Sequence, residues 1–297
     1  MADLSRLKAA LRAHRPDPDL PIDALRAKMR TDAEALPVPD GISVEVLDAG
    51  GVPAELVQPA DAGADGAGFT VLYLHGGGYC CGSASSVRGL AGRLALAGPA
   101  RVLALDYRLA PEHPYPAGRD DAVTAYRWLL DGGTDPSRIV IAGDSAGGGL
   151  AVVTALALRD AGTPVPGAVV SISPWADVRL ASGSVAAKAE NDPIVTLKSL
   201  ERFAEYYTGG GDRSDPGVSP VLADLSGLPR LLIQVGEDEC LVDDAEELAA
   251  RAKACGVEVT LEVWPEMVHV WHLLAPRLEP ANQAIERIAR WVGEPSG

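Results

Sequence analysis

A serine lies between glycines at the end of an apolar stretch, in the G-D-S-A-G motif of residues 143–147. Residues 138–142 (RIVIA) before it are typical of a buried strand, and residues 148–162 after it have a helical pattern. A tight strand-to-helix turn of this kind projects a hydroxyl above the sheet. Ser145 is therefore a candidate nucleophile, although a glycine-rich turn that only packs a helix on a strand would look similar.

One histidine and three glycines, residues 75–78, follow a second apolar stretch. Without a Cβ, Gly77 and Gly78 let their backbone N–H groups point at a developing negative charge, which predicts an oxyanion hole. The amide of Ala146, directly after the serine, would be the third donor. A phosphate-binding loop is disfavoured because no Lys-Ser/Thr pair follows and Cys81 stands at the third glycine of G-x-G-x-x-G.

A serine hydroxyl needs a base with a pKa near 7, which indicates histidine. His269 and His272 both follow the last apolar stretch, at the carboxyl end of a predicted strand, where open α/β sheets assemble their sites. His269 comes first and is the predicted base. We expect His272 in the following helix as a packed or surface residue, and His75 as a residue that orients the glycine loop.

The acid that orients this histidine is expected after the preceding strand, residues 230–236, which gives the chain order serine, acid, histidine. Any carboxylate within reach would fix the imidazole tautomer and stabilise the imidazolium. Five residues qualify by position, and this reasoning does not choose among them: Glu237, Asp238, Glu239, Asp243 and Asp244.

Eight apolar stretches would position these residues. Residues 42–51 and 52–60 alternate like two paired strands around a Gly-Gly turn. The other six are nearly continuous in Val, Ile and Leu and alternate with helix-sized segments: residues 69–77, 101–108, 138–145, 167–175, 230–238 and 257–265. This pattern predicts an α/β fold with a mostly parallel sheet covered by helices on both faces.

Two regions depart from this alternation. Leucines and other apolar residues at helical spacing predict two short amphipathic helices near the N-terminus: Leu4, Leu7 and Leu11, then Ile22, Leu25 and Met29. Between about residues 180 and 215 a helical insertion with Ser-, Gly- and Asp-rich ends replaces a simple crossover. Excursions of this kind commonly cover a site.

The composition excludes several classes of protein. The 297 residues are 47% hydrophobic and 23% charged, as in a folded globular protein. The net charge of −15 repels phosphate backbones and anionic lipid, so neither nucleic acid nor a membrane is an expected partner. Four cysteines without C-x-x-C spacing, and no signal-peptide or membrane-spanning pattern, predict a reduced, cytoplasmic protein.

Five blocks in a fixed order carry a family resemblance: H-G-G-G-Y, D-Y-R-L-A-P-E, G-D-S-A-G-G, S-P-W-A-D and H-V-W. From about residue 40 to the C-terminus the chain resembles the bacterial hormone-sensitive-lipase-like esterases, and its G-D-S-A-G motif is similar to that of the subgroup named for it. The resemblance implies an α/β-hydrolase fold and cleavage of small- to medium-chain carboxylic esters without a metal or organic cofactor.

The resemblance also implies roles for single residues. Ser145 would be the nucleophile and His269 the base, with three oxyanion donors: Gly77, Gly78 and Ala146. Many members have a D-P-L-x-D motif whose first Asp is the catalytic acid. Placing residues 241–243 on L-x-D puts Glu239 at the position of that Asp, with Asp238 as the alternative. Arg108 and Glu112 are expected to form a structural ion pair.

The family pattern further implies a cap over the serine. Residues 1–40 and 180–214 would form the cap, and residues 41–179 and 215–297 the two parts of the core. Candidate pocket walls are Trp175, Leu200, Phe203, Tyr206 and Tyr207, although these aromatic residues could equally pack the cap onto the core.

These inferences predict a serine carboxylesterase that acts on a small-molecule ester through a covalent acyl-enzyme, and the resemblance implies that a homodimer can form. Lactone opening, amide cleavage and acyl transfer to an alcohol would use the same residues, so they remain alternatives. A non-catalytic protein that binds a small molecule is the last alternative.

Overall fold

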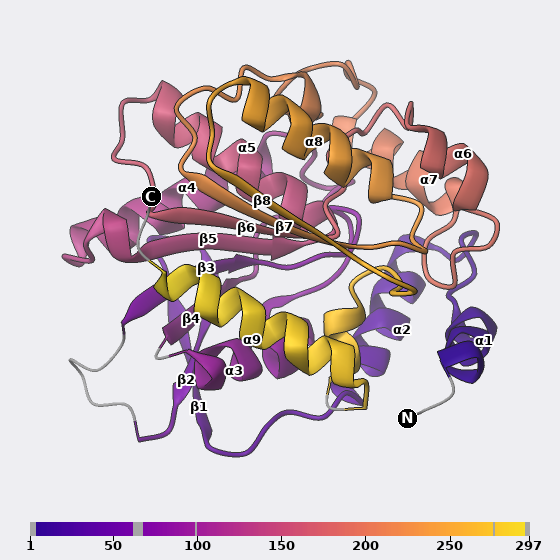
Figure 1. Cartoon of the computed structure of the whole chain (residues 1–297), viewed down its shortest axis with the longest axis horizontal. Helices are drawn as coiled ribbons and strands as arrows, with labels where there is room; N and C mark the ends of the chain where they lie inside the picture. The colour runs from indigo at the N-terminus through magenta and orange to yellow at the C-terminus, as the bar shows by residue number, and fades with distance from the viewer. Residues whose placement is uncertain (1–3, 62–67, 99, 276, 295–297) are drawn as a thin grey trace.

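A computed structural model describes residues 4–61, 68–98, 100–275 and 277–294 (Figure 1). In this part of the chain eight strands form one sheet: β1 (Ile42–Asp48), β2 (Pro53–Pro59), β3 (Phe69–Leu74), β4 (Ala100–Leu105), β5 (Ile139–Asp144), β6 (Ala168–Ile172), β7 (Arg230–Gly236) and β8 (Val259–Trp264). The helices are α1 (Leu4–His14), α2 (Ile22–Glu34), α3 (Arg88–Ala97), α4 (Ala117–Asp131), α5 (Ala146–Asp160), α6 (Gly183–Lys188), α7 (Leu197–Thr208), α8 (Val242–Ala254) and α9 (Glu279–Gly293).

The strands lie in the order β1-β2-β4-β3-β5-β6-β7-β8. β1 and β2 form the antiparallel hairpin that the Gly-Gly turn predicts, with Ile42 opposite Pro59 and Asp48 opposite Pro53. β2 is antiparallel to β4, and all pairs from β4 to β8 are parallel. All eight predicted strands are present, and the predicted α/β fold is confirmed.

Helices cover both faces of the sheet, with α4, α5 and α8 on one side and α3 and α9 on the other (Figure 1). Alternate residues of the central strands supply the two cores. Leu72 of β3 and Ile141 of β5 pack with the α5 side, whereas Tyr73 and Val140 pack with the α3 and α9 side. Because both faces are buried, these strands need apolar residues at every position.

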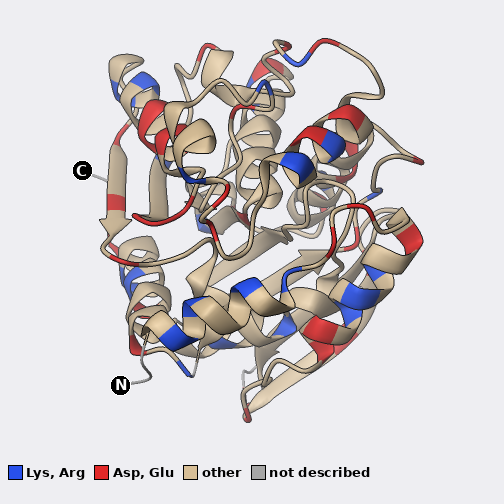
Figure 2. Cartoon of the chain, turned by 90° about the vertical axis from the view of Figure 1, so that its right-hand side faces the viewer, with Lys and Arg blue, Asp and Glu red and all other residues tan. Residues whose placement is uncertain are grey.

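The helices of residues 1–40 and 180–214 gather at the carboxyl ends of the parallel strands, at the right of Figure 1. Figure 2 faces this side and shows acidic and basic residues mixed on its helices. Arg202 of α7 donates to the carbonyls of Pro18 and Leu20, which joins the two segments predicted to form the cap. None of the helices described here is both long and apolar enough to cross a membrane.

The predicted Arg108–Glu112 ion pair is wrong. Arg108 instead binds Asp121 of α4, with Nη2 to Oδ1 at 2.7 Å. Glu112 faces the cap and binds Arg26 of α2 at 2.6 Å. The backbone turns between the two residues, so the Arg108 side chain points to α4 and the Glu112 side chain points to α2. Each therefore binds a residue outside the D-Y-R-L-A-P-E block.

Candidate active site

Ser145 lies in a sharp turn between β5 and α5. Its backbone has φ 56° and ψ −121°, a conformation that L-residues rarely adopt. The turn is possible because Gly147 carries no Cβ, which would overlap the carbonyl oxygen of Leu74 on β3. The Ser145 carbonyl accepts from the amides of Gly148 and Trp175, each at 3.0 Å. These contacts hold the hydroxyl at the end of the sheet.

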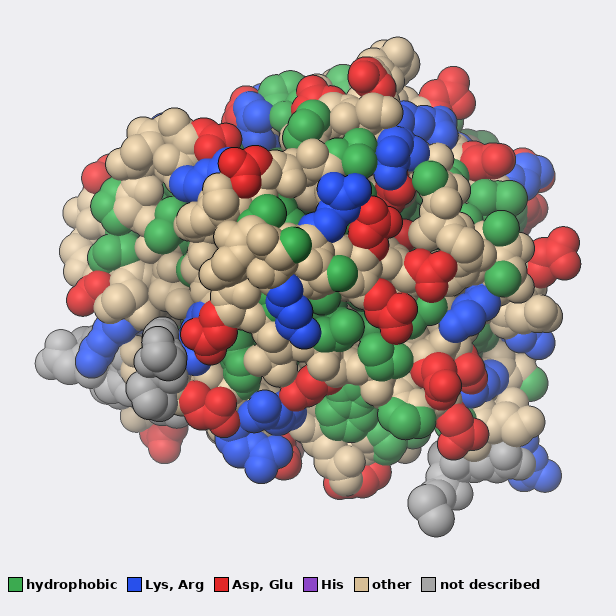
Figure 3. Space-filling model, turned by 45° about the horizontal axis from the view of Figure 1, so that its top comes forward, with side chains coloured by type: hydrophobic (Ala, Val, Ile, Leu, Met, Phe, Trp, Pro, Cys, Tyr) green, Lys and Arg blue, Asp and Glu red, His purple; other side chains and the backbone are tan. Residues whose placement is uncertain are grey.

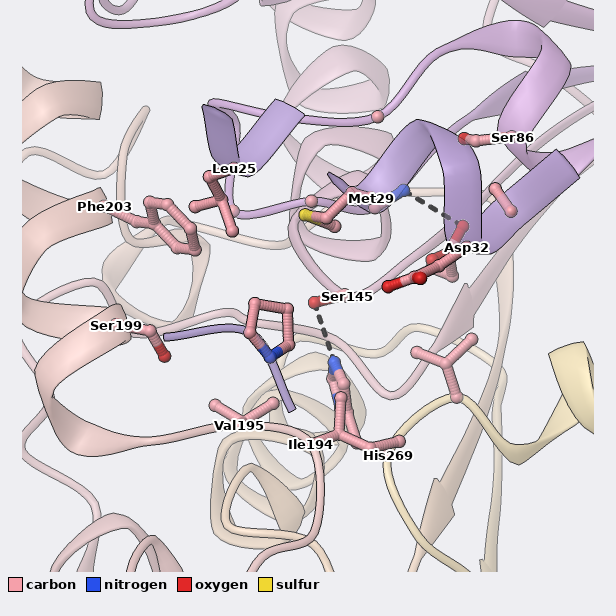
Figure 4. Close-up of a pocket in the computed structure, with 18 of the residues that line it drawn as sticks. Leu25, Met29, Asp32, Ser86, Ser145, Ile194, Val195, Ser199, Phe203 and His269 are labelled. Atoms are coloured by element: carbon pink, nitrogen blue, oxygen red, sulfur yellow. Dashed lines mark hydrogen bonds between the residues drawn. The ribbon is translucent and has the colours of Figure 1, made fainter. Parts of the chain in front are cut away.

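Three side chains that follow three different strands meet here. His269 Nε2 lies 2.9 Å from Ser145 Oγ, and His269 Nδ1 lies 2.6 Å from Glu239 Oε2. Figure 4 shows the first of these hydrogen bonds at the floor of the cavity. His269 is 5% exposed and Glu239 is fully buried. The structure thus brings together the serine, the histidine and one of the five candidate carboxylates.

The other four carboxylates have different partners. The alternative acid, Asp238, is 47% exposed at its side chain and binds Lys8 of α1 at 2.5 Å. The remaining three accept backbone amides: Glu237 from Glu266, Asp243 from Ser184, and Asp244 from Ala176 and Asp177. Glu239 is the one that turns inward from the loop after β7 to reach the imidazole.

The charge of Glu239 is well satisfied in the interior. Its Oε1 accepts the Gly236 amide at 2.5 Å and the Ser173 hydroxyl at 2.8 Å, while Oε2 faces the histidine. Burial opposes the charged imidazolium of His269, but the hydrogen bond and charge of Glu239 outweigh it. The pKa of His269 is therefore raised above its ordinary value of 6.5.

The glycine loop forms a cradle beside the serine. Gly77 (φ 119°) and Gly78 (φ 63°) both have backbone conformations that favour glycine. The amides of Cys80 and Cys81 bind the Gly77 carbonyl and close the turn. Within the described residues, the amides of Gly77, Gly78 and Ala146 donate no hydrogen bond to the protein. All three are free to bind an oxyanion.

The two remaining histidines of interest are packed into the fold. His75 stacks on Tyr107 with ring centres 4.4 Å apart, and its Nδ1 lies 2.7 Å from the Gly76 carbonyl. His272 lies in a short 3-10 helix, Trp271–Leu274, and its Nε2 lies 2.8 Å from Gln234 Oε1. Burial lowers the pKa of His272 to about 3, so its ring stays neutral at physiological pH.

A cavity of about 840 Å³ lies between the cap and Ser145. Its walls are mostly apolar and come from the cap helices, the loop before α7 and the loop after β6: Leu25, Met29, Trp175, Ile194, Val195 and Phe203. Figure 4 shows Leu25, Met29, Ile194, Val195 and Phe203 around the serine and the histidine. The cavity has the size and lining of a small-molecule site.

The prediction of four aromatic wall residues is wrong for two of them. Trp175 and Phe203 line the cavity, as does Leu200, whereas Tyr206 and Tyr207 do not. Tyr207 stacks on Tyr79, with ring centres 3.6 Å apart, and joins α7 to the core. Tyr206 lies beside Arg202, whose Nε is 3.3 Å from its hydroxyl. Successive residues of α7 point in different directions, so only part of its aromatic run faces the serine.

Sequence reasoning missed most of the apolar wall residues, among them Leu25, Met29, Ile194 and Val195. Leu25 and Met29 are four residues apart, so they share one face of a helix, but this spacing does not show what that face covers. As for metals, no group of three or more His, Cys, Asp or Glu among the described residues is arranged to hold an ion.

Comparison with known proteins agrees with this geometry. A family model described as alpha/beta hydrolase fold matches residues 71–273. An acetyl-hydrolase of Streptomyces hygroscopicus is 49% identical over 251 residues, 84% of this chain and 82% of the relative. The carboxylesterase NlhH of Mycobacterium tuberculosis is 40% identical over 228 residues, 73% of this chain and 70% of that protein.

A solved structure described as an esterase from the bacterial hormone-sensitive lipase family aligns with a TM-score of 0.93 and 45% identity, covering 98% of each chain. The chain therefore belongs to the α/β-hydrolase-fold family. Within it, the chain is a bacterial hormone-sensitive-lipase-like esterase, a carboxylic ester hydrolase.

Proposed function

We propose that Ser145, His269 and Glu239 form the catalytic triad of this esterase. The observation that carries the proposal is the continuous hydrogen-bonded chain from Ser145 Oγ through His269 to Glu239, at the floor of the cavity. A hydroxyl is a poor nucleophile at neutral pH, and this arrangement supplies the base that activates it.

The reaction proceeds by acyl transfer. Ser145 Oγ attacks the ester carbonyl while His269 Nε2 takes its proton, and Glu239 stabilises the imidazolium. The amides of Gly77, Gly78 and Ala146 bind the oxyanion. His269 then gives the proton to the leaving alcohol, and an acyl-enzyme remains on Ser145. Water, deprotonated by His269, attacks this intermediate and releases the carboxylic acid and free Ser145.

The cavity favours small esters with short to medium acyl chains. Its apolar walls would hold an alkyl chain, and Phe203 lies directly against Gly78 of the glycine loop, which limits the space beside the oxyanion. The G-D-S-A-G motif supports placing the chain in the subgroup named for it.

Three further assignments belong to this proposal. A cytoplasmic location and a homodimer remain predictions from the sequence and the family. The absence of a nucleic-acid partner is supported by the net charge of −15. Figure 3 shows one face of the molecule, on which acidic and basic side chains are interspersed with hydrophobic ones.

Hydrolysis of p-nitrophenyl esters from acetate to palmitate tests the proposal. We expect activity that declines beyond medium chains and that falls by roughly 10⁴- to 10⁶-fold in Ser145→Ala. Glu239→Gln should lose about 10⁴-fold in kcat, whereas Asp238→Asn, which changes an exposed residue, serves as its matched control. Equal losses in the last two variants would contradict the assignment of the acid.

The rival acyl chemistries are tested with the same proteins. A lactone and an anilide are offered in place of the ester, and an alcohol acceptor is offered in competition with water while a p-nitrophenyl ester supplies the acyl group. If one of these reactions is faster than the hydrolysis of every p-nitrophenyl ester and depends on Ser145, the triad assignment stands and the preference for simple esters is wrong. If unmodified protein is inactive on every substrate, the catalytic proposal fails.

A further inference from the structure

Ser173, the first residue of the S-P-W-A-D block, has a hydroxyl that contacts Glu239 and the amide of Val270 and does not line the cavity. We propose that Ser173 is a positioning residue that holds the carboxylate of Glu239 and, through the backbone, the loop of His269. This inference rests on the proposed triad.

The direction of the Ser173 hydrogen bonds follows from the chemistry of its two partners. The Val270 amide lies 3.1 Å from Ser173 Oγ and can only donate. Glu239 Oε1 lies 2.8 Å away on the other side, and an ionised carboxylate can only accept. The hydroxyl proton therefore points to Glu239. One oxygen atom joins the acid to the residue that directly follows His269.

The backbone of Ser173 is constrained so that its side chain reaches this place. Ser173 follows β6 with φ 45°, in the left-handed region that favours glycine. Its amide donates to the Gln234 carbonyl on β7 at 2.7 Å, and the residue is fully buried. Val270, its partner across the site, also has a positive φ, of 48°. Uncommon conformations of this kind persist where the surrounding contacts over-determine them.

Glu239 needs this support because a glutamate has one more rotatable bond than an aspartate. The Ser173 hydroxyl and the Gly236 amide, at 2.5 Å, both bind Oε1. With Oε1 fixed by two donors, Oε2 is left to face His269 Nδ1 at 2.6 Å. Without the hydroxyl, the carboxylate keeps a single donor on Oε1, and the buried Val270 amide loses its acceptor.

Loss of the Ser173 hydroxyl is expected to slow the chemical step. Ser173 is not among the residues that line the cavity, so its loss should leave substrate binding unchanged. A carboxylate that orients His269 less well should instead slow the proton transfers. We expect Ser173→Ala to lower kcat by about 10- to 100-fold with KM within about twofold, since small misplacements of catalytic groups have effects of this size.

Two companion variants separate the hydroxyl from the backbone. Ser173→Gly also removes the hydroxyl, yet it accepts the positive φ without strain, so it should lose as much kcat as Ser173→Ala. Ser171→Ala is the matched control, because Ser171 lies on β6, just before Ser173, and is equally buried but donates to the Gly148 carbonyl instead. Its kcat should stay within about twofold of the unmodified protein. If Ser173→Gly keeps full activity, the hydroxyl has no positioning role.

A double-mutant cycle tests whether Ser173 acts through the acid. In a Glu239→Ala background no carboxylate remains to be held and only the contact with the Val270 amide is lost, so adding Ser173→Ala should cost clearly less kcat than it does in the unmodified protein. If the two losses multiply instead, the inference is overturned. An inactive unmodified protein, or an active Ser145→Ala variant, would refute the proposed triad, whereas full activity of both Ser173 variants would refute only this inference.

Discussion

The carboxylate of Asp192, in the cap, accepts a hydrogen bond of 2.9 Å from the amide of Cys240, the residue that directly follows Glu239. Asp192 is fully buried, and its other oxygen accepts the amides of Ile194 and Val195. One side chain thus holds both a wall of the cavity and the loop of Glu239, the proposed catalytic acid. The loop between α6 and α7 is therefore bonded directly to the loop after β7 that carries Glu239.

Asp192→Ala is expected to lower both stability and kcat. The change leaves one buried and two partly buried amides without their acceptor, which should reduce the free energy of unfolding by about 2–4 kcal/mol. Glu239 and the wall at Ile194 lose a common anchor, so kcat should fall about tenfold even where the variant is fully folded. Chemical denaturation and ester kinetics on the same sample measure the two effects. A stability loss with unchanged kcat would show that the anchor does not act on the site.

The pH profile of kcat/KM should report the raised pKa of His269. The imidazole must be neutral to take the proton of Ser145, so activity falls as the pH drops through this pKa. Glu239 raises the pKa of His269 by more than burial lowers it, so the midpoint of the acidic limb should lie above pH 6.5. In Glu239→Gln the stabilising charge is gone and burial remains, so the midpoint should move to lower pH.

Asp238→Asn is the control for this shift, because its exposed carboxylate binds Lys8 and not the imidazole. The midpoint of that variant should match the unmodified protein. A wild-type midpoint at or below 6.5, or no shift in Glu239→Gln, would argue against control of His269 by Glu239.

Gly78→Ala should impair the oxyanion hole. A Cβ at this position would overlap the ring of Phe203, and φ 63° is unfavourable for alanine. Displacing one amide donor should lower kcat by roughly 10²- to 10³-fold. Gly133→Ala is the matched control, since Gly133 has φ 83° but no atoms near its Cβ position. Comparable kcat losses in the two variants would point to general backbone strain instead.

Arg26→Ala should weaken the attachment of the N-terminal cap helices. Its guanidinium binds Glu112 and also donates to the buried carbonyls of Cys80 and Ala110, each at 2.8 Å. Losing the two carbonyl contacts should lower the free energy of unfolding by about 1–3 kcal/mol, measured by chemical denaturation. Glu112→Gln keeps these contacts, so a smaller effect is expected. If it destabilises the protein as much as Arg26→Ala does, the ion pair carries the attachment.

The Arg26–Glu112 pair also predicts a pH dependence. The hydrogen bond to Arg26 lowers the pKa of Glu112 from 4.5 to about 2. The contribution of the pair is therefore complete above about pH 4.5 and is lost as the pH falls toward 2. Unfolding experiments across this range should show a difference between the unmodified protein and Glu112→Gln that disappears in acid.

The sequence by itself determined the sheet and the positions of the reactive groups along the chain. Short, near-continuous apolar runs that alternate with helix-sized segments indicate strands buried on both faces, and the G-D-S-A-G turn requires its glycines wherever the fold places it. Ser145, His269 and the glycine loop were found from such local signals. Each lies directly after a predicted strand, so its approximate place in space follows from the strand.

Only the tertiary structure decided which groups meet. The five candidate acidic residues follow β7. The path of the loop points Glu239 inward to His269, whereas Asp238 stays exposed and binds Lys8. Ser173 and Asp192 reach this loop from 66 and 48 residues away, which no local pattern encodes. The walls of the cavity depend in the same way on which faces of α2 and α7 pack toward the core. Contacts between distant segments are set by packing, and packing is a property of the whole chain.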